Sequence, residues 1–344
     1  MLMVVFGAGA SYDSAPFYPP HSQSRLPARD EQRRPPLAKE LFENRDVFAT
    51  AVSNLPRCKA INIRLRGLPE DTSIEQELQK IQAEAEGDPE RHRQLAAVRF
   101  YLQYIIFQCQ RGWKNRAVKD GSNYDALLDQ LRHWSKGREK ICLVTFNYDT
   151  MLEEALPAVD IRIEGLRDYI ARDNYKIIKL HGSVSWARQV NAVIHSLDNR
   201  DEWDVASELI DRATEIDITD TYLFDKDCPI ARSKGVPVFP AVAIPLETKS
   251  YECPPDHIET LEECIPQVTR VLVIGWRATE YHFLQLLAQK HRPPLRVMIV
   301  SGGYDSAQEV SARFEQAGIT GKFSLANAGF TNFILRGQAN EFLQ

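Results

Sequence analysis

The chain has 344 residues, of which 44% are hydrophobic and 26% are charged. These fractions are typical of soluble globular proteins and exclude a disordered chain, and the length predicts roughly two domains at ~150 residues each. The longest apolar runs, such as Val271–Ile274, fall far short of the roughly 18 residues that a membrane helix needs, so we expect no membrane partner. With 42 Lys and Arg against 47 Asp and Glu, the net charge of −5 gives no strong sign of direct nucleic-acid binding.

Six cysteines are present, at positions 58, 109, 142, 228, 253 and 264. No two of them form a C-x-x-C pair, which excludes a zinc ribbon and a thioredoxin-type motif, and no cluster of His, Asp or Glu has the spacing of metal ligands. We therefore expect no metal site. Cys109 and Cys142 lie in apolar segments, as expected of buried, reduced thiols in a cytoplasmic protein.

The first part of the chain contains one strand and then a long helical region. An apolar strand at Leu2–Phe6 leads into the small-residue turn Gly7–Ser11. Residues 16–36 contain six prolines and four arginines without hydrophobic periodicity, which indicates a loop, and we hypothesise that it is a mobile lid. From residue 37 to 137, apolar residues recur at helical spacing between capping signals such as Asp88-Pro89, so this region is predicted to be a helical module.

The remainder of the chain alternates strands with helices. The expected elements are strands at Ile141–Phe146, Ile177–Leu180, Val271–Gly275 and Val297–Val300, an extended segment at Val236–Pro245, and helices at Tyr148–Leu156, Thr279–His291 and Asp305–Gln316. Residues 184–235 have no regular pattern apart from an expected helix over Asp201–Ile216. Continuous apolar strands that alternate with helices predict the α/β class. The expected fold is a Rossmann-like parallel sheet with helices on both faces, formed by residues 1–36 and 138–344, with the all-helical module 37–137 inserted.

Four small polar segments follow the expected strands. They are Gly7–Ser11, Asn147–Asp149, His181–Ser183 and Gly275–Arg277, and Ser301 follows a fifth strand. Ligands of open parallel sheets bind beyond the carboxyl ends of the strands, where such segments meet. We therefore treat these residues as one candidate site.

The segment Gly7-Ala8-Gly9-Ala10-Ser11 fits either a phosphate cradle or a plain tight turn. Its amides and the Ser11 hydroxyl can donate to a pyrophosphate, because glycine lets the backbone approach closely. Tyr12 stands where the G-x-G-x-x-G fingerprint has its third glycine, and no acidic residue ends a second strand about 20 residues later. An ordinary Rossmann dehydrogenase is therefore disfavoured.

The other segments also carry two interpretations each. Asn147 is placed to orient a ribose or a water, whereas Asp149 fits that pocket or the cap of the next helix. His181 fits a general base, because imidazole titrates near neutral pH, or a capping or solvent-facing histidine. In Gly275-Trp276-Arg277 the backbone can face an adenosine with Arg277 near phosphate, or Trp276 can serve packing alone.

Together the ordered segments Gly7–Ser11, Thr145–Asp149, His181–Ser183 and Ile274-Gly275 resemble the sirtuin family, which has Gly-Ala-Gly, Thr-Gln-Asn-x-Asp, His-Gly and Gly-x-Ser motifs in this order. The resemblance implies a Rossmann-like domain that binds NAD+ and cleaves its nicotinamide–ribose bond. By this resemblance Asn147 and His181 are the catalytic residues, Asn147 positioning the ribose and the attacking group and His181 acting as general base. The implied cofactor-binding residues are Gly7, Ala8, Gly9, Ser11, Asp149, Gly182, Ser183, Gly275, Trp276, Arg277 and Ser301.

Departures from the family narrow the expected activity. The chain lacks the two C-x-x-C pairs of the zinc module of deacylating sirtuins, and Phe146 stands where they have Gln. In this respect it is more similar to the sirtuin-like NAD hydrolases of bacterial anti-phage defence. That resemblance implies an NAD+ glycohydrolase that uses NAD+ as substrate, assembles as a homo-oligomer and is activated by a nucleotide trigger or a companion defence protein. The alternatives are an NAD-dependent protein deacylase without zinc and a non-enzymatic sensor of NAD or ADP-ribose.

Overall fold

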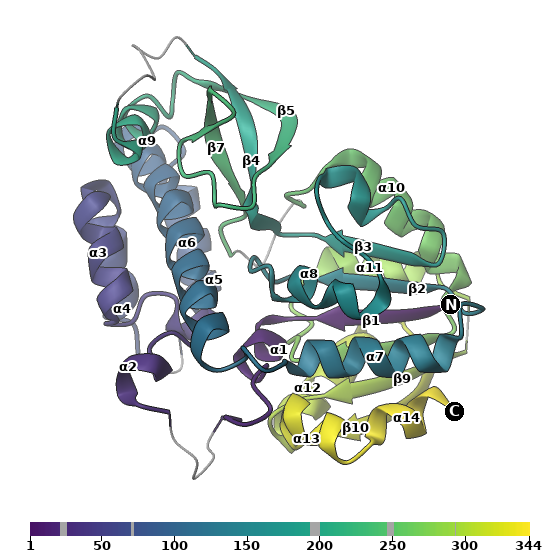
Figure 1. Ribbon diagram of the computed structural model, residues 1–344. Helices are drawn as coiled ribbons and strands as arrows, with labels where there is room; N and C mark the ends of the chain where they lie inside the picture. Colours follow the sequence, from purple (N-terminus) through teal and green to yellow (C-terminus); the bar gives the residue numbers. More distant parts are fainter. Residues whose placement is uncertain (21–25, 70–71, 193–199, 246–250, 293) are drawn as a thin grey trace.

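A six-stranded parallel sheet is the centre of the computed structural model, which describes residues 1–20, 26–69, 72–192, 200–245, 251–292 and 294–344 (Figure 1). Its strands are β1 (Leu2–Phe6), β2 (Ile141–Thr145), β3 (Tyr175–Lys179), β8 (Arg270–Ile274), β9 (Leu295–Val300) and β10 (Gly321–Ala326). They lie in the order β10-β9-β8-β1-β2-β3, and every neighbouring pair is parallel. The strand order reverses between β1 and β8, as in the doubly wound nucleotide-binding folds. This confirms the predicted Rossmann-like sheet.

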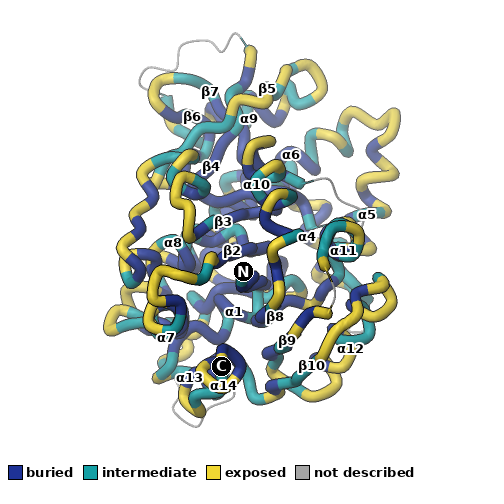
Figure 2. The backbone as a smooth tube through the Cα atoms, turned by 90° about the vertical axis from the view of Figure 1, so that its right-hand side faces the viewer, coloured by how far each residue is buried: buried dark blue, intermediate teal, exposed yellow. Residues whose placement is uncertain are grey.

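Helices cover both faces of this sheet, as predicted. One face carries α7 (Asn123–Ser135), α8 (Met151–Ala155), α13 (Gly329–Leu335) and α14 (Gln338–Leu343), and the other carries α10 (Pro255–Cys264), α11 (Tyr281–Lys290) and α12 (Tyr304–Gln316). Parallel strands buried from both sides must be apolar at every position, because neither face meets water. All five residues of β1 and of β2 are buried accordingly, as the dark strands at the centre of Figure 2 illustrate.

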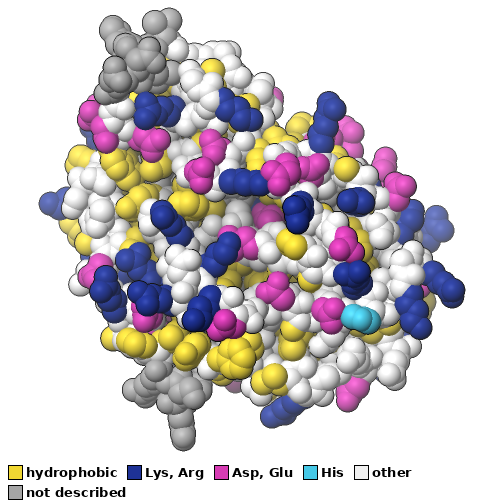
Figure 3. Space-filling view, viewed as in Figure 1, with side chains coloured by type: hydrophobic (Ala, Val, Ile, Leu, Met, Phe, Trp, Pro, Cys, Tyr) yellow, Lys and Arg dark blue, Asp and Glu magenta, His cyan; other side chains and the backbone are white. Residues whose placement is uncertain are grey.

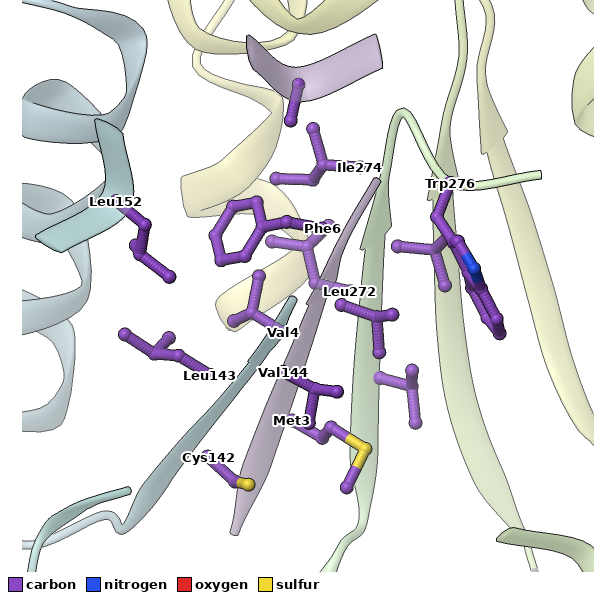
Figure 4. Packing of buried hydrophobic residues seen from close by; sticks show 14 of the residues in the cluster. Met3, Val4, Phe6, Cys142, Leu143, Val144, Leu152, Leu272, Ile274 and Trp276 are labelled. Atoms are coloured by element: carbon purple, nitrogen blue, oxygen red, sulfur yellow. The ribbon is translucent and has the colours of Figure 1, made fainter. Parts of the chain in front are cut away.

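The core of the sheet is built from side chains of three adjacent strands. Val4 and Phe6 of β1 lie among Leu143 of β2 and Leu272 of β8, and Leu152 of α8 closes the cluster (Figure 4). Each of these five side chains is at most 2% exposed. The packing fixes the register, so that Phe6, Thr145 and Ile274 end their strands at one level.

Between residues 37 and 137 the described residues form helices and connecting turns, as expected from the helical spacing, and the division of the chain into an inserted module and a sheet domain stays a prediction. Its elements are η1 (Ala38–Glu40), α3 (Asp46–Asn54), η2 (Pro56–Cys58), α4 (Lys59–Arg66), α5 (Ile74–Glu84), the long α6 (Pro89–Arg116) and α7. The predicted cap of α6 is present, since Asp88 Oδ1 accepts from the Glu90 amide at 2.9 Å. Helix α7 packs on the core of the sheet, whereas α3 to α6 share a second hydrophobic cluster. The boundary at residue 137 stays a prediction.

A second, antiparallel sheet occupies much of residues 184–235, where no regular pattern was expected, and includes part of the predicted extended segment Val236–Pro245. It consists of β4 (Gly182–Asn191), β5 (Asp217–Phe224), β6 (Arg232–Ser233) and β7 (Val236–Val242) in the order β5-β4-β7-β6, with α9 (Glu202–Asp211) between β4 and β5. This sheet packs against α6, where the Phe100 and Phe239 rings meet edge to face at 5.1 Å. Strand β4 begins one residue after His181, so the small sheet is continuous with the candidate site.

Two segments near the N-terminus differ from expectation. Residues predicted as a small-residue turn begin a short helix, α1 (Ala8–Tyr12). Within the expected lid, residues 21–25 lie outside the described residues, and α2 (Ala28–Glu31) is helical. The described part of this segment is anchored by the buried Arg34, which donates to the carbonyl oxygens of Tyr12 at 2.7 Å and Tyr18 at 3.0 Å. Its guanidinium also lies 4.4 Å from the ring centroid of Trp113.

Candidate active site at the carboxyl ends of the strands

The predicted strand-end segments meet because β8, β1, β2 and β3 are neighbours in the sheet. The loops after β1 and β8 touch at the point where the strand order reverses, which is where doubly wound folds bind ligands. The amides of Gly7 and Gly9 donate to the carbonyl oxygens of Ile274 at 3.0 Å and Gly275 at 2.9 Å. These two loops therefore form one rigid floor.

Close backbone packing accounts for the glycines in this floor. A Cβ added to Gly9 would lie 2.8 Å from Gly275 Cα, and one added to Gly7 would lie 2.5 Å from Trp276 Cα. Gly275 has φ +61, and its Cβ would come within 2.3 Å of the Ala10 nitrogen. Because the amides of Gly7 and Gly9 are bonded to protein carbonyls, the phosphate cradle stays a prediction for these residues and for Ala8.

Asn147 is the centre of a buried polar cluster at the end of β2. Its Nδ2 donates to the Gly7 carbonyl and to Ser11 Oγ, both at 3.0 Å, and lies 3.3 Å from the Tyr124 hydroxyl. A carbonyl oxygen can only accept, so the amide nitrogen faces Gly7 and the orientation of the amide is fixed. Its Oδ1 is buried and accepts no hydrogen bond from any described residue. Such an acceptor is costly to leave unpaired and is suited to receive a hydroxyl or a water.

Asp149 joins this cluster from the other side of the same loop. Its Oδ1 accepts from the Met151 amide at 3.1 Å, which caps α8, and its carboxyl also interacts with Ser11. Burial raises the pKa of the Asp149 carboxyl, while the nearby Lys179 ammonium and the hydrogen bond from Ser11 oppose that rise. The contact with Met151 fits the helix-cap interpretation of Asp149, and its role in a cofactor pocket stays a prediction.

The buried Lys179, which was not predicted from the sequence, holds the backbone of Asp149 by a hydrogen bond. Lys179 is fully buried, and its Nζ donates to the Asp149 carbonyl oxygen at 2.6 Å and lies 3.0 Å from Glu153 Oε1. The Tyr169 hydroxyl donates to the same Glu153 oxygen at 3.0 Å. A charged residue in an apolar strand that ends beside a candidate site was the available signal for Lys179, because such a charge requires a partner.

His181 lies in an aromatic pocket beside a carboxylate. The ring is 8% exposed, meets Phe146 edge to face at 5.0 Å and lies 6.1 Å from the Tyr148 ring. Its Nε2 is 3.9 Å from Glu280 Oε1. An imidazole with a carboxylate beside it is an arrangement that general-base chemistry commonly uses.

Glu280 was also missed by sequence reasoning. Its Oε2 accepts hydrogen bonds from Trp276 Nε1 and, at 3.2 Å, from the Thr279 hydroxyl, so the carboxylate is held in place. Trp276 is 5% exposed and stacks on Phe146 with ring centroids 4.9 Å apart, so the indole serves packing as well as holding Glu280. The signal for Glu280 was its position three residues after the Gly275–Arg277 segment.

The remaining predicted residues make contacts within the fold. Gly182 has φ +82, and a Cβ there would lie 1.9 Å from the Ala241 oxygen. The Ser183 hydroxyl interacts with Ser185 at 3.0 Å, and Ser301 bonds through its amide to Ala326 at 2.9 Å. Arg277 is exposed, and its carbonyl accepts from Arg313. Cofactor binding by Gly182, Ser183, Ser301 and Arg277 therefore stays a prediction.

Further observations concern metal ligands, membrane-spanning helices, cysteines and surface charge. Among the described residues, no group of three or more His, Cys, Asp or Glu side chains is arranged to hold a metal ion, and no described helix is long and apolar enough to cross a membrane. All six cysteines are buried free thiols. On the face in Figure 3, basic and acidic side chains are interspersed over the helical region and the sheet region alike.

No protein-family model matches the chain, and no curated protein matches it significantly in sequence. Solved Sir2 structures are similar to it at low identity. A Sir2 complex with the inhibitor EX-527, 2′-O-acetyl-ADP-ribose and a deacetylated p53 peptide is 12% identical, covers 100% of this chain and 95% of its own, and has a TM-score of 0.39. A mutant Sir2 homologue with 2′-O-acetyl ADP ribose is also 12% identical, covering 99% and 91% with a TM-score of 0.40. The fold assignment rests on the strand order and register of the sheet itself.

Proposed function

We propose that the chain is an NAD+ glycohydrolase that converts NAD+ and water to nicotinamide and ADP-ribose. The observation that carries the proposal is the unpaired, buried Oδ1 of Asn147, which lies at the end of β2 and bonds through Nδ2 to Gly7 in the loop after β1, next to the point where the strand order reverses. A ribose hydroxyl or a water is the kind of donor that this oxygen lacks. The ordered motifs that resemble sirtuins, and the missing C-x-x-C pairs, support NAD+ as substrate and hydrolysis as the reaction.

The chemistry requires few groups because the leaving group is already activated. The glycosidic nitrogen of NAD+ carries a positive charge, so the C–N bond breaks with its electron pair moving to the nicotinamide ring. The ribosyl carbon becomes oxocarbenium-like and bonds to the oxygen of a water, whose proton passes to His181. Asn147 Oδ1 orients the water or a ribose hydroxyl, and the Glu280 carboxylate, 3.9 Å from His181 Nε2, stabilises the protonated ring.

In the cell we propose that this activity depletes NAD+ in the cytoplasm as the effector of a bacterial anti-phage defence system. The chain would act as a homo-oligomer that a nucleotide trigger or companion protein activates. This part of the proposal follows from the resemblance to the zinc-lacking defence NAD hydrolases.

The test is nicotinamide release from NAD+ by the purified full chain, measured by chromatography with and without candidate activators. Asn147→Ala and His181→Ala should each lower the rate at least about a hundredfold, in line with removal of a general base or an orienting group. Asn191→Ala and His133→Ala, at exposed positions, are the matched controls and should retain activity. Thermal unfolding of each variant verifies that the fold persists.

The alternatives give different results in the same experiment. Undiminished release in both Asn147→Ala and His181→Ala refutes the residue assignment. Release that requires an acyl-lysine peptide identifies a deacylase instead. Calorimetric binding of NAD+ or ADP-ribose without turnover under any condition identifies a sensor.

A further inference from the structure

A cleft separate from the strand-end site lies between the helical region and the antiparallel sheet. Its volume is about 420 Å³, which is within the range of small-molecule sites. The lining is mainly apolar and includes Leu95 and Ala96 of α6, Phe239 of β7 and Ile244, which follows β7. None of the predicted site residues lines this cleft.

Two guanidinium groups that line the cleft, one from α6 and one from β4, both lie within ion-pair distance of one carboxylate. Arg99 of α6 and Arg188 of β4 both line the cleft, and their Nη1 atoms lie 3.2 Å and 3.7 Å from the two oxygens of Glu252. The Tyr222 hydroxyl donates to Glu252 Oε1 at 2.9 Å, and the Glu252 side chain is 9% exposed. The structure thus contains a formed carboxylate-binding arrangement that adjoins an apolar cavity.

We propose that this cleft binds a small organic acid with an apolar or aromatic body. The body would lie on Leu95 and Phe239. The acidic group would take a hydrogen bond from Arg99 in place of the one that Arg99 now makes to Glu252. It would also pair with Arg188, whose guanidinium keeps its bonds to the Thr219 carbonyl and Asp220. Guanidinium groups bind oxyanions through two parallel hydrogen bonds to two of the anion's oxygens, so a carboxylate or sulfonate fits better than a neutral polar group. The exposed Glu86 and His92 lie at the rim of the cleft and leave the apolar floor free.

A ligand in the cleft would affect the position of His181 through two backbone hydrogen bonds. The Glu252 amide donates to the Leu180 carbonyl oxygen at 2.9 Å, and the amide of Ala243, the residue before Ile244, donates to the His181 carbonyl oxygen at 3.0 Å. A ligand that displaces the Glu252 carboxylate therefore acts on the backbone that positions His181. This regulatory step rests on the proposed function, whereas binding in the cleft does not.

The probe for binding is 1-anilinonaphthalene-8-sulfonate, which combines an aromatic body with one acidic group. Its Kd for the full chain is measured by fluorescence titration. Ala96→Phe, which fills the cleft from α6, and Arg99→Gln, which removes one cation, should each raise the Kd at least about tenfold, as expected for loss of a charge-assisted contact. Arg57→Gln, an arginine outside this cleft that is paired with Glu90 and Asp211, is the control and should leave the Kd unchanged.

Several outcomes overturn the site. Absence of probe binding, a Kd within about twofold of the unchanged protein in Arg99→Gln, or competitive displacement by NAD+ would each do so. Circular dichroism checks the fold of Ala96→Phe. If Ala96→Phe is unfolded, the Kd of Arg99→Gln is the result that tests the site. For the regulatory step, the probe should change the calorimetric Kd of NAD+ at least about fivefold, and an unchanged Kd overturns the coupling. If the chain does not hydrolyse NAD+, the Kd of the probe and the Kd of NAD+ can still be measured, so the two proposals fail separately.

Discussion

Removal of the buried Lys179 ammonium is expected to destabilise the protein more than any ordinary surface change. Lys179→Met keeps the length of the side chain but leaves the Glu153 carboxylate, now 3.0 Å from Nζ, without its cation. Breaking a buried ion pair from one side costs about 3–5 kcal/mol, because the remaining charge is uncompensated. That is a large part of the roughly 5–15 kcal/mol by which domains are stable. The free energy of unfolding is measured by urea titration with tryptophan fluorescence.

A second substitution in the same chain separates the ion pair from simple packing. Glu153→Gln removes the uncompensated charge, so Lys179→Met with Glu153→Gln should recover at least about 2 kcal/mol relative to Lys179→Met alone. Lys176→Met is the matched control on the same strand, because Lys176 Nζ donates to the Ile170 carbonyl, and it should cost about 1 kcal/mol. The reasoning is refuted if Lys179→Met costs no more than Lys176→Met, or if the double variant is no more stable than the single one.

Three further predictions concern the site and its supports. Glu280→Gln keeps acceptors for its two hydrogen bonds but removes the charge beside His181, so nicotinamide release should fall about tenfold or more with little change in Tm; full activity would contradict the role. Gly275→Ala combines positive φ with a clash against Ala10 and should lower the free energy of unfolding in urea by at least about 2 kcal/mol, whereas the unobstructed Gly302→Ala should change it by about 0.5 kcal/mol. Burial raises the pKa of the Asp13 carboxyl, so its contribution to stability is complete below its ordinary pKa and is lost as pH rises through the raised value. Urea titrations between pH 3 and 8 should therefore find Asp13→Asn gaining stability relative to the unchanged protein as pH rises, and a gain on lowering the pH would reverse the inferred direction.

The central sheet could be predicted because its strands are apolar at every position. Leu2–Phe6 and Ile141–Thr145 are buried on both faces, as expected of strands in a parallel sheet that helices cover from both sides. The antiparallel sheet gave weaker signals. Strand β5 is exposed or half-exposed along its whole length, so it has no apolar pattern. The segment of β7 was expected to be extended, but Pro237 and Pro240 argue against its pairing in the middle of a sheet.

The candidate site was predictable to the extent that it follows strand ends. Asn147 and Ser11 come together because β1 and β2 are neighbours. The strand pattern predicted that both belong to one parallel sheet, whereas their pairing is known from the structure alone. Tyr124 was not predictable, because a helical residue reaches the site only through the packing of α7 on the sheet. Glu280 lies beyond its strand end, so it was not predictable. The hydrogen bond from Trp276 that holds Glu280 was not predictable either, because stacking on Phe146 places the indole.

The central position of β1 has a consequence for how the molecule is assembled. Leu2 pairs with Ile141 on one side and with Arg270 on the other, so the partners lie roughly 140 and 270 residues away along the chain. Loop closure over the longer distance costs only about 0.6 kcal/mol more than over the shorter one, so entropy alone does not set the order of pairing. During synthesis, however, β2 emerges first. The edge of β1 that pairs with β8 keeps its amides and carbonyls unpaired until the last quarter of the chain is made. Nascent chains truncated before residue 270 should therefore be the aggregation-prone species and the ones on which chaperones act.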